Sequence, residues 1–266
     1  MNWEELTAPE FARAVKRAGG VCVVPIGVVE KHGDHLPLGT DFLSGKALAA
    51  RAAEQEPVVV FPPYYFGSIC EAKHQPGAIA VRGRLIIDLL ENVCEEIARN
   101  GLKKIVLLNA HGGNRFLSHF VRIMLEKERG YTVYLIDLAD YHPGRDPRWL
   151  AMRQTTVDQH GGESETSCML VYRPDLVNMK AVSKKAGRPL KRLAHLPVKS
   201  VGISWYADFP DHYAGDARYA SEKKGRLLVD LAAGRVAAIL KAIKRDRVSG
   251  KLLREYHARS RQPTGR

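Results

Sequence analysis

Five side chains that can bind a metal ion lie close together near the start of the chain. They occupy a span of twelve positions inside the stretch VVPIGVVEKHGDHLPLGTDF, and they are Glu30, His32, Asp34, His35 and Asp41. Glu30 and His32 are two positions apart after an apolar run, and on a strand that spacing puts both side chains on one face. Asp41 follows a loop punctuated by glycine and proline that can fold back toward them. The spacing therefore predicts a polar cluster at the end of a buried strand.

The mixture of carboxylates and imidazoles indicates a metal site. It suits zinc or manganese better than calcium, which prefers a shell made only of oxygen atoms. Asp41 is the candidate for a carboxylate that bridges two ions, whereas we expect Asp34 to be a loop residue and His35 a neighbour of the site. The sequence holds no GxSxG, Walker lysine or GxGxxG motif. A site of this kind without a placed nucleophile is typical of a hydrolase in which metal activates water.

Two further polar clusters follow later in the chain. His111 lies in LLNAHGGN, directly after an apolar run, and two glycines beside it allow close backbone approach. His160, Glu163 and Glu165 lie in QHGGESETS, at the start of a helical pattern. His111 could instead cap a helix, and one of the two glutamates could be present because a helix N-terminus favours acids.

Apolar runs and helical patterns alternate along the chain, which predicts an α/β layered sandwich with a mainly parallel sheet flanked by helices. The predicted strands span 21–29, 58–66, 104–110 and 131–141. The predicted helices span 42–54, 85–100, 114–129, 163–173 and 219–246. Because sites in such sheets form beyond the carboxyl ends of the strands, the three polar clusters are expected to meet there.

The bulk properties of the 266-residue chain predict one domain, residues 1–245, and a basic tail, residues 246–266, that frays or packs on a neighbour. The net charge of +12 resides in two segments, 181–200 and 241–266, away from the polar clusters, so nucleic-acid binding is not expected. No apolar run is long enough for a membrane span, and the start MNWEELTAPEF is unlike a signal peptide. We therefore expect a cytoplasmic protein whose four cysteines are buried free thiols.

Several blocks of the sequence, in order, resemble the creatininase family. PIGVVEKHGDHLPLGTD, NAHGGN and HGGESETS are similar to the family's three site motifs, and together they are highly specific. HQPGA (74–78) and GDARYASEKKG (215–225) are similar to two further family blocks, so that the resemblance spans residues 25–225. It implies an α/β sandwich that assembles as a homohexamer and acts on a small-molecule substrate.

The resemblance also implies a dinuclear site that holds two divalent ions per subunit, zinc and/or manganese. Glu30 and His111 would hold one ion, His32 and Glu163 the other, with Asp41 between them.

The remaining roles implied by the resemblance are catalytic. His160 would pass a proton to the leaving nitrogen, and Glu165 would hydrogen-bond that histidine or the attacking water.

The resemblance leaves the substrate open. An amide or cyclic amide of a small polar metabolite is the first hypothesis, and a cyclic diketone cleaved at a carbon–carbon bond is the alternative. Creatinine is not expected, because residues 149–160 (WLAMRQTTVDQH) lack the tryptophan that creatininase has shortly before its shuttle histidine. A third reading, a basic binding protein with a structural metal, fits poorly, since structural zinc sites are closed and rich in cysteine.

Overall fold

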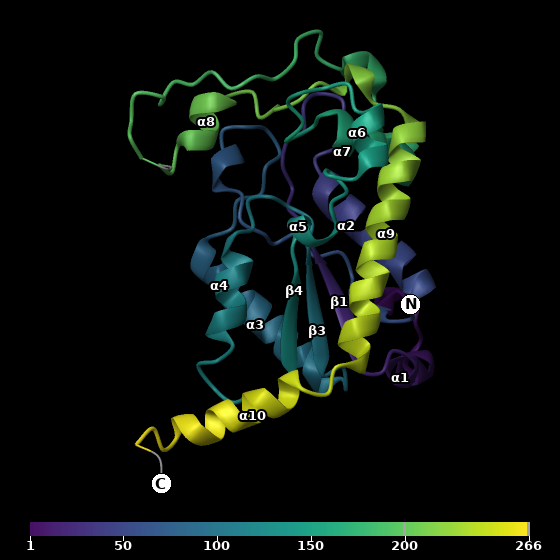
Figure 1. Cartoon of the computed structure of the whole chain (residues 1–266), viewed down its shortest axis with the longest axis vertical. Helices are drawn as coiled ribbons and strands as arrows, with labels where there is room; N and C mark the ends of the chain where they lie inside the picture. The colour runs from purple at the N-terminus through teal and green to yellow at the C-terminus, as the bar shows by residue number, and fades with distance from the viewer. Residues whose placement is uncertain (199–200, 265–266) are drawn as a thin grey trace.

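A four-stranded, fully parallel sheet with the strand order β2-β1-β3-β4 forms the centre of the molecule (Figure 1). The computed structural model describes residues 1–198 and 201–264. The strands are β1 (Val21–Ile26), β2 (Val59–Val60), β3 (Lys104–Asn109) and β4 (Thr132–Ile136). The predicted α/β architecture with a parallel sheet is therefore confirmed.

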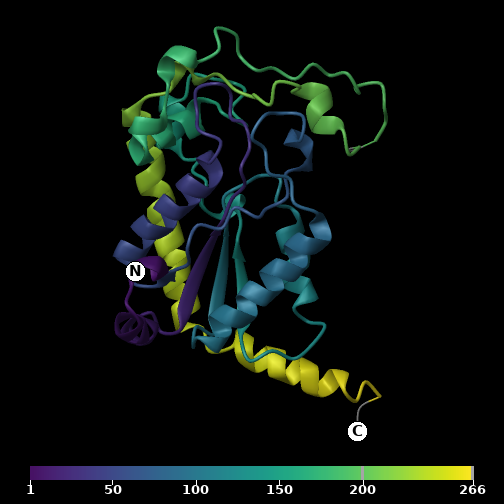
Figure 2. The same cartoon turned by 180° about the vertical axis from the view of Figure 1, so that it is seen from behind.

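Helices cover both faces of the sheet, which explains why its strands carry apolar side chains on both faces. Successive side chains of β1 point to opposite faces, so Val21 and Val23 join one core while Cys22 and Val24 join the other. The first core is covered by α2 (Thr40–Gln55) and α9 (Glu222–Arg245). The second is covered by α1 (Ala8–Arg17), α3 (Gly83–Arg99) and α4 (Phe116–Ile123), as Figures 1 and 2 show from opposite sides.

The remaining helices are short, apart from one at the carboxyl end. They are α5 (Leu138–Tyr141), α6 (Pro147–Met152), α7 (Glu163–Tyr172), α8 (Ser204–Asp208) and α10 (Ser249–Ser260). Single 3₁₀ turns are η1 (Trp3–Glu5), η2 (Cys70–Ala72), η3 (Pro174–Leu176), η4 (Met179–Ala181) and η5 (Ala217–Tyr219). Helix α7 packs against both α2 and α9 near the carboxyl ends of the strands.

Two predicted strands are shorter than expected, each for a local reason. The predicted strand 58–66 pairs regularly only at Val59–Val60, because Pro62 and Pro63 lack the N–H group that a sheet ladder needs. The predicted strand 131–141 ends at Ile136 and turns into helix α5. There, Asp137 and Asp140 form a capping box, each accepting a backbone N–H across the first turn.

The segment predicted to be a tail, residues 246–266, contains helix α10, which extends along the lower edge of the molecule in Figure 1. Asp246 turns the chain between α9 and α10. It accepts hydrogen bonds from the Tyr134 hydroxyl at 2.7 Å and from the Val248 N–H at 2.8 Å. The division into a domain of residues 1–245 and a tail stays a prediction.

Two further expectations concern the membrane and the cysteines. Across the described ranges, no helix combines the length and the apolar character needed to cross a membrane. All four cysteines are free, and Cys22 and Cys94 are buried as expected. The expectation is wrong for Cys70, which is exposed at the start of η2, and Cys168 is half-buried.

Candidate metal centre

The three polar clusters predicted from the sequence meet at the carboxyl edge of the sheet. Glu30 and His32 follow β1, and His111 follows its neighbour β3. Asp41 reaches the same place from the first turn of α2, because the loop between β1 and α2 folds back and Glu30 N–H donates to Leu38 O. All four side chains are buried, with none more than 7% exposed.

Two overlapping groups of donor atoms share Asp41, and a third group consists of Glu30, His32 and His160. In the first, His111 Nδ1 lies 2.9 Å from Glu30 Oε1 and 3.0 Å from Asp41 Oδ2. In the second, His32 Nε2 lies 3.1 Å from Asp41 Oδ1, and Glu165 completes the group. Within each group the ligand atoms lie within 4.8 Å of one another. Asp41 belongs to the first two, with one carboxylate oxygen facing each histidine.

Buried oxygen atoms without partners indicate that this cluster fits cations. Glu30 Oε1 and Asp41 Oδ2 are fully buried, yet neither accepts a hydrogen bond from any residue that the structure describes. Buried polar atoms are normally satisfied, so each such exception requires an explanation. A divalent ion supplies one, because carboxylates and imidazoles that converge at this spacing are the usual ligands of zinc and manganese.

The structure places Glu163 outside the cluster, contrary to the ligand set implied by the family resemblance. Its carboxylate forms a buried ion pair with Lys224 of α9 and accepts hydrogen bonds from Gln154 N–H and Thr155 N–H, at 3.0 and 2.9 Å. Glu165 lies beside His32 and Asp41 instead, and is held by the N–H of Gly161 at 2.6 Å. The two glutamates leave the first turn of α7 in nearly opposite directions, so only one can face the cluster.

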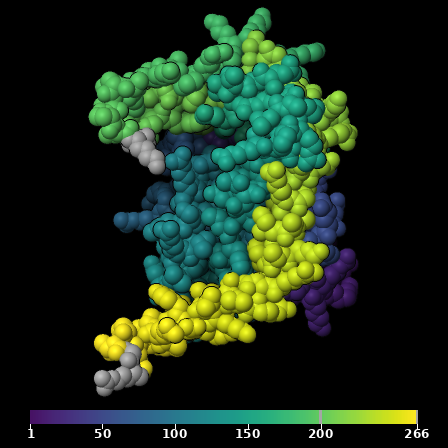
Figure 3. Space-filling view, viewed as in Figure 1, coloured from purple at the N-terminus to yellow at the C-terminus, as the bar shows by residue number. Residues whose placement is uncertain are grey.

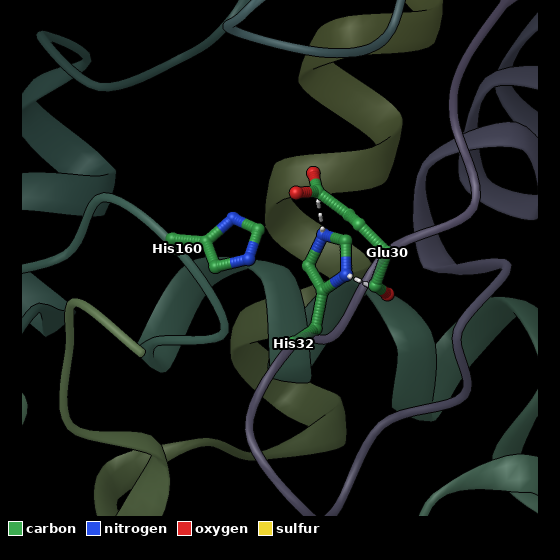
Figure 4. Close-up of side chains that lie close together, drawn as sticks. All are labelled: Glu30, His32 and His160. Atoms are coloured by element: carbon green, nitrogen blue, oxygen red, sulfur yellow. Dashed lines mark hydrogen bonds and ion pairs between the residues drawn. The ribbon is translucent and has the colours of Figure 1, made fainter. Parts of the chain in front are cut away.

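His160 lies over His32, with the ring centroids 4.1 Å apart and the rings stacked (Figure 4). Its backbone pairs with Ala214 through two hydrogen bonds of 3.0 and 2.9 Å, which fixes the position of the side chain. His160 Nε2 lies 2.7 Å from Lys31 O, and since a carbonyl can only accept, Nε2 carries the proton. The other ring nitrogen, Nδ1, is left to accept a proton.

Burial changes the acidity of several groups in the centre. It lowers the pKa of His160 to about 3, with a further contribution from the charge of His32, so this imidazole is neutral at pH 7. It raises the pKa of Glu165 to about 7. For Glu30 burial acts in the same direction, but the imidazole of His111 close by outweighs it and holds the pKa well below its usual range.

A second group of polar residues orients His111. Asn109, the last residue of β3, accepts a hydrogen bond from the His111 N–H at 3.1 Å. Its amide donates to Asp137 Oδ1 at 2.8 Å, and its own carbonyl accepts from the Tyr141 hydroxyl at 2.7 Å. The ends of β3 and β4 are thereby tied together directly beneath the site.

Asp34 and His35 lie where the sequence predicts, outside the donor groups. Asp34 is exposed and pairs with Lys31 at 2.9 Å. His35 is buried, but its Nε2 contacts the Thr166 hydroxyl at 2.8 Å.

Sequence analysis missed two residues of the centre, His212 and Trp205. His212 Nε2 lies 2.5 Å from Glu30 Oε2, and Trp205 Nε1 lies 3.0 Å from His212 Nδ1. The indole ring also approaches His160, with a centroid distance of 5.8 Å. Helix α8 thus places an indole beside His160. The available signal was the position of His212, three residues before the GDARYASEKKG block.

Two cavities adjoin the metal centre. The larger, about 490 Å³, is bordered by Glu30, His111 and His160 on one side and by Trp205 and Arg115 on the other. In Figure 3 the segment around α8 overhangs a hollow on this face of the molecule.

The second cavity, about 270 Å³, lies among α2, α5, α7 and α9 and shares Asp41 and Glu165 with the first.

The chain is similar to several known proteins. Creatinine amidohydrolase from Pseudomonas putida is 29% identical over 196 residues, which are 67% of this chain and 74% of that protein. Mycofactocin precursor peptide peptidase from Mycolicibacterium smegmatis is 31% identical over 159 residues, 58% of each chain. The 3-dehydro-scyllo-inosose hydrolase of Thermotoga maritima is 24% identical over 254 residues, 84% of this chain and 77% of that protein.

Solved structures share the fold. A crystal structure of creatinine amidohydrolase (creatininase) superposes with a TM-score of 0.80 at 23% identity, covering 92% of this chain and 98% of that one. A mutant creatininase described as Zn-Zn type gives a TM-score of 0.79 at 24% identity, with the same coverage. A structure described as Creatininase Mn gives 0.74 at 23% identity, covering 92% and 99%.

The family model described as "Creatininase: Creatinine amidohydrolase" matches residues 4–240, which are nearly the whole chain. With the three site motifs gathered at one edge of the sheet, the chain belongs to the creatininase family of hydrolases.

Proposed function

We propose that this protein is a dinuclear metal-dependent hydrolase that cleaves an amide or cyclic amide in a small polar metabolite. The observation that carries the proposal is the shared position of Asp41, whose two oxygens face two separate histidines within two donor groups. Zinc, manganese or both are the expected ions, since the chain's fold matches creatininase structures described as Zn-Zn type and Mn.

Each ion has a set of residues that would hold it. Glu30 and His111 would bind the first, His32 and Glu165 the second, and Asp41 would bind both. When bound, the ions would supply an activated water and polarise the carbonyl that it attacks. The protein's contribution is to hold these five side chains on the strand ends and helix starts that carry them, with Glu165 half-buried and the other four buried.

His160 is positioned to transfer the proton that the attacking water releases. Its ring is neutral at pH 7, because burial lowers its pKa, and Nε2 is engaged by Lys31 O. Nδ1 can therefore accept the proton released as water adds to the carbonyl and then hand it to the leaving nitrogen. A general base and acid in this position contributes about 10²–10⁴-fold to the rate.

The cavity supports a small substrate. A volume of about 490 Å³ suits a metabolite rather than a protein chain, and the indole of Trp205 forms one wall. Arg115 offers a positive charge to a polar or acidic group on the substrate. Because Trp205 stands near His160, creatinine belongs in the substrate panel, although the sequence around His160 argues against it.

A cyclic diketone is the second candidate, favoured by the Thermotoga maritima relative, whose alignment covers 84% of this chain. The same residues would serve, since water would add to a ketone carbonyl and His160 would protonate the carbon atom that departs. The two candidates differ only in the atom that receives the proton.

Metal content and a substrate panel test the proposal together. Purified protein, stripped with a chelator and reloaded with Zn²⁺ or Mn²⁺, should bind two ions per chain by mass spectrometry and hydrolyse a member of a panel of formamides, cyclic amides including creatinine, and cyclic diketones. His160→Ala should lower turnover by about 10²–10⁴-fold with both ions retained. Protein that cannot hold even one ion per chain would refute the proposal, and loss of metal in His160→Ala would refute the role of His160.

We further propose a homo-oligomer, the hexamer implied by the family resemblance. Exposed apolar side chains on the segment around α8 support this proposal, and they include Leu190, Val198, Val201 and Ile203. Light scattering on the purified protein would give the mass, and a monomer at micromolar concentration would contradict it.

A further inference from the structure

His212 and Glu30 form a buried contact that joins segments 182 positions apart in the chain. His212 Nε2 lies 2.5 Å from Glu30 Oε2, and each side chain is only 1% exposed. The contact lies within the candidate metal site, yet none of the three donor groups includes His212.

Trp205 decides which nitrogen of His212 carries the proton. An indole N–H can only donate, so His212 Nδ1, 3.0 Å from Trp205 Nε1, must accept. The ring proton of His212 is then on Nε2, where it donates to Glu30 Oε2. Trp205, His212 and Glu30 thus form a directed chain of two hydrogen bonds that ends on a metal-facing carboxylate.

This chain divides the two oxygens of Glu30 between two tasks. Oε2 is occupied by His212, whereas Oε1 lies 2.9 Å from His111 Nδ1 and accepts no hydrogen bond from the described residues. With Oε2 held, the carboxylate cannot rotate to exchange its oxygens without breaking a buried hydrogen bond. His212 therefore determines which oxygen would be free to hold the first ion.

The backbone at His212 supports a role beyond packing. Its φ of 53° lies in the left-handed region, which a residue other than glycine adopts at a cost of about 1 kcal/mol. The surrounding loop holds it there, since His212 N–H donates to Phe209 O at 3.0 Å and the rings of Trp205 and Phe209 pack together. Strain of this kind persists where the surrounding structure demands one side-chain position.

We propose that His212, oriented by Trp205, is a positioning residue that sets the affinity of the metal position built from Glu30 and His111. The proposal rests on the dinuclear centre proposed above. Residues that hydrogen-bond a metal ligand typically contribute 10–100-fold to metal affinity, because they orient the ligand and raise its basicity. The α8 segment, which borders the substrate cavity, is thereby linked to the metal centre.

Zinc titration of the metal-stripped full chain, with a chromophoric chelator as competitor, tests the proposal. We compare four variants with the wild type: His212→Leu, His212→Gln, Trp205→Phe and the control His74→Ala. His74 Nε2 contacts Pro210 O at 2.7 Å, so the control loosens the same loop without touching Glu30. Both His212 variants place a residue other than glycine in the same left-handed conformation, so their comparison isolates the side chain. Gln keeps an N–H that can reach Glu30.

His212→Leu should weaken binding of one of the two zinc ions by about 10–100-fold and leave the other unchanged. Trp205→Phe should weaken binding of the same ion by about fivefold, the effect expected from the loss of one hydrogen bond. His212→Gln should recover most of the loss, and His74→Ala should match the wild type.

Two results would overturn the proposal: a zinc affinity in His212→Leu within twofold of the wild type, or an equal loss in His74→Ala. Wild-type protein that binds no zinc would instead refute the dinuclear centre itself. If His212→Leu does not fold, the difference between Trp205→Phe and His74→Ala decides the matter, because equal affinities in these two variants would also contradict the proposal.

Discussion

Glu163 and Glu165 show how much depends on the direction in which one residue faces. Both lie in the first turn of α7, where the helix N-terminus favours acids, and two positions correspond to about 200° of rotation around the helix. One side chain meets Lys224 and the other meets His32 and Asp41. The residue types indicate that an acid serves the metal centre, but the rotation of α7 against its neighbours decides which acid.

Substitution of each glutamate by glutamine should separate these roles. Glu165→Gln should lose one of the two bound ions while remaining folded, because a neutral amide is a poor ligand. Glu163→Gln should keep both ions but lose about 3–5 kcal/mol of unfolding free energy, since Lys224 would be left buried without a counter-charge. Mass spectrometry measures the metal content of each variant, and urea denaturation measures its free energy of unfolding.

The reverse pattern, with metal lost from Glu163→Gln and retained by Glu165→Gln, would restore the ligand set that the family resemblance implies. Lys224→Met combined with Glu163→Gln is a useful control, because removing both charges should recover much of the stability lost in Glu163→Gln alone.

At the scale of elements, the crossing of α7 and α9 places Glu163 beside Lys224. A side chain at Gly225 of α9 would bring its Cβ within 1.9 Å of Ser167 O on α7. Only glycine permits this close approach of the two backbones. The helical pattern in the sequence predicts both helices, but it does not contain the distance between them.

Two alanine substitutions on α9 should therefore have opposite effects. Gly225→Ala should destabilise the protein by about 3 kcal/mol, because two packed backbones would have to separate. Gly234→Ala should stabilise it by about 0.5–1 kcal/mol, since its Cβ would meet no described atom within 4 Å and alanine is the better helix former. Urea midpoints with unchanged slopes would measure both effects, and a stable Gly225→Ala protein would contradict the close crossing.

The stability of the folded protein should depend on pH through Asp246, which lies in the turn between α9 and α10. Hydrogen bonds from Ser249, from the Val248 N–H and from Tyr134 hold the pKa of Asp246 well below its usual range. A carboxylate with a lowered pKa stabilises the folded state fully above its unfolded-state pKa of about 4 and loses that contribution as the pH falls below it.

Asp246→Asn should accordingly be less stable than the wild type at pH 7, and the difference should shrink as the pH falls from about 5 toward 3. Thermal unfolding of both proteins across that range measures the difference. A gap that stays constant with pH would mean that the charge of Asp246 does not contribute.

At the scale of the whole molecule, the metal centre joins parts of the chain that are otherwise separate. Its candidate ligands come from the loop after β1, the start of α2, the loop after β3 and the start of α7. Without cations, Glu30 and Asp41 would remain as buried charges beside histidines, which is costly in a low-dielectric interior. Bound ions should therefore stabilise the entire fold rather than one loop.

Chelation should lower the melting temperature of the metal-loaded protein. At an ion concentration 100 times the dissociation constant, each bound ion contributes about 2.7 kcal/mol to the free energy of unfolding. Calorimetry before and after treatment with EDTA, and after re-addition of Zn²⁺, would test this. Identical melting curves for the stripped and reloaded proteins would show that the cluster does not bind metal in the folded state.

The identity of the ligand types could be predicted from the amino-acid sequence because it depends on local order along the chain. Apolar runs that are followed at once by Glu30, His32 and His111 place these side chains at strand ends, and parallel strands bring their carboxyl ends to one edge. The position of Asp41 between two histidines and the layered α/β architecture follow from the same reasoning.

The choice between Glu163 and Glu165, and the presence of His212 and Trp205, could not be predicted in this way. These features depend on the rotation of α7 and on a loop whose contact with Glu30 spans 182 positions. Such contacts are selected by packing across the whole fold, where a hydrogen bond of the right geometry replaces water around a buried carboxylate. The order of residue types along the chain does not by itself predict that geometry.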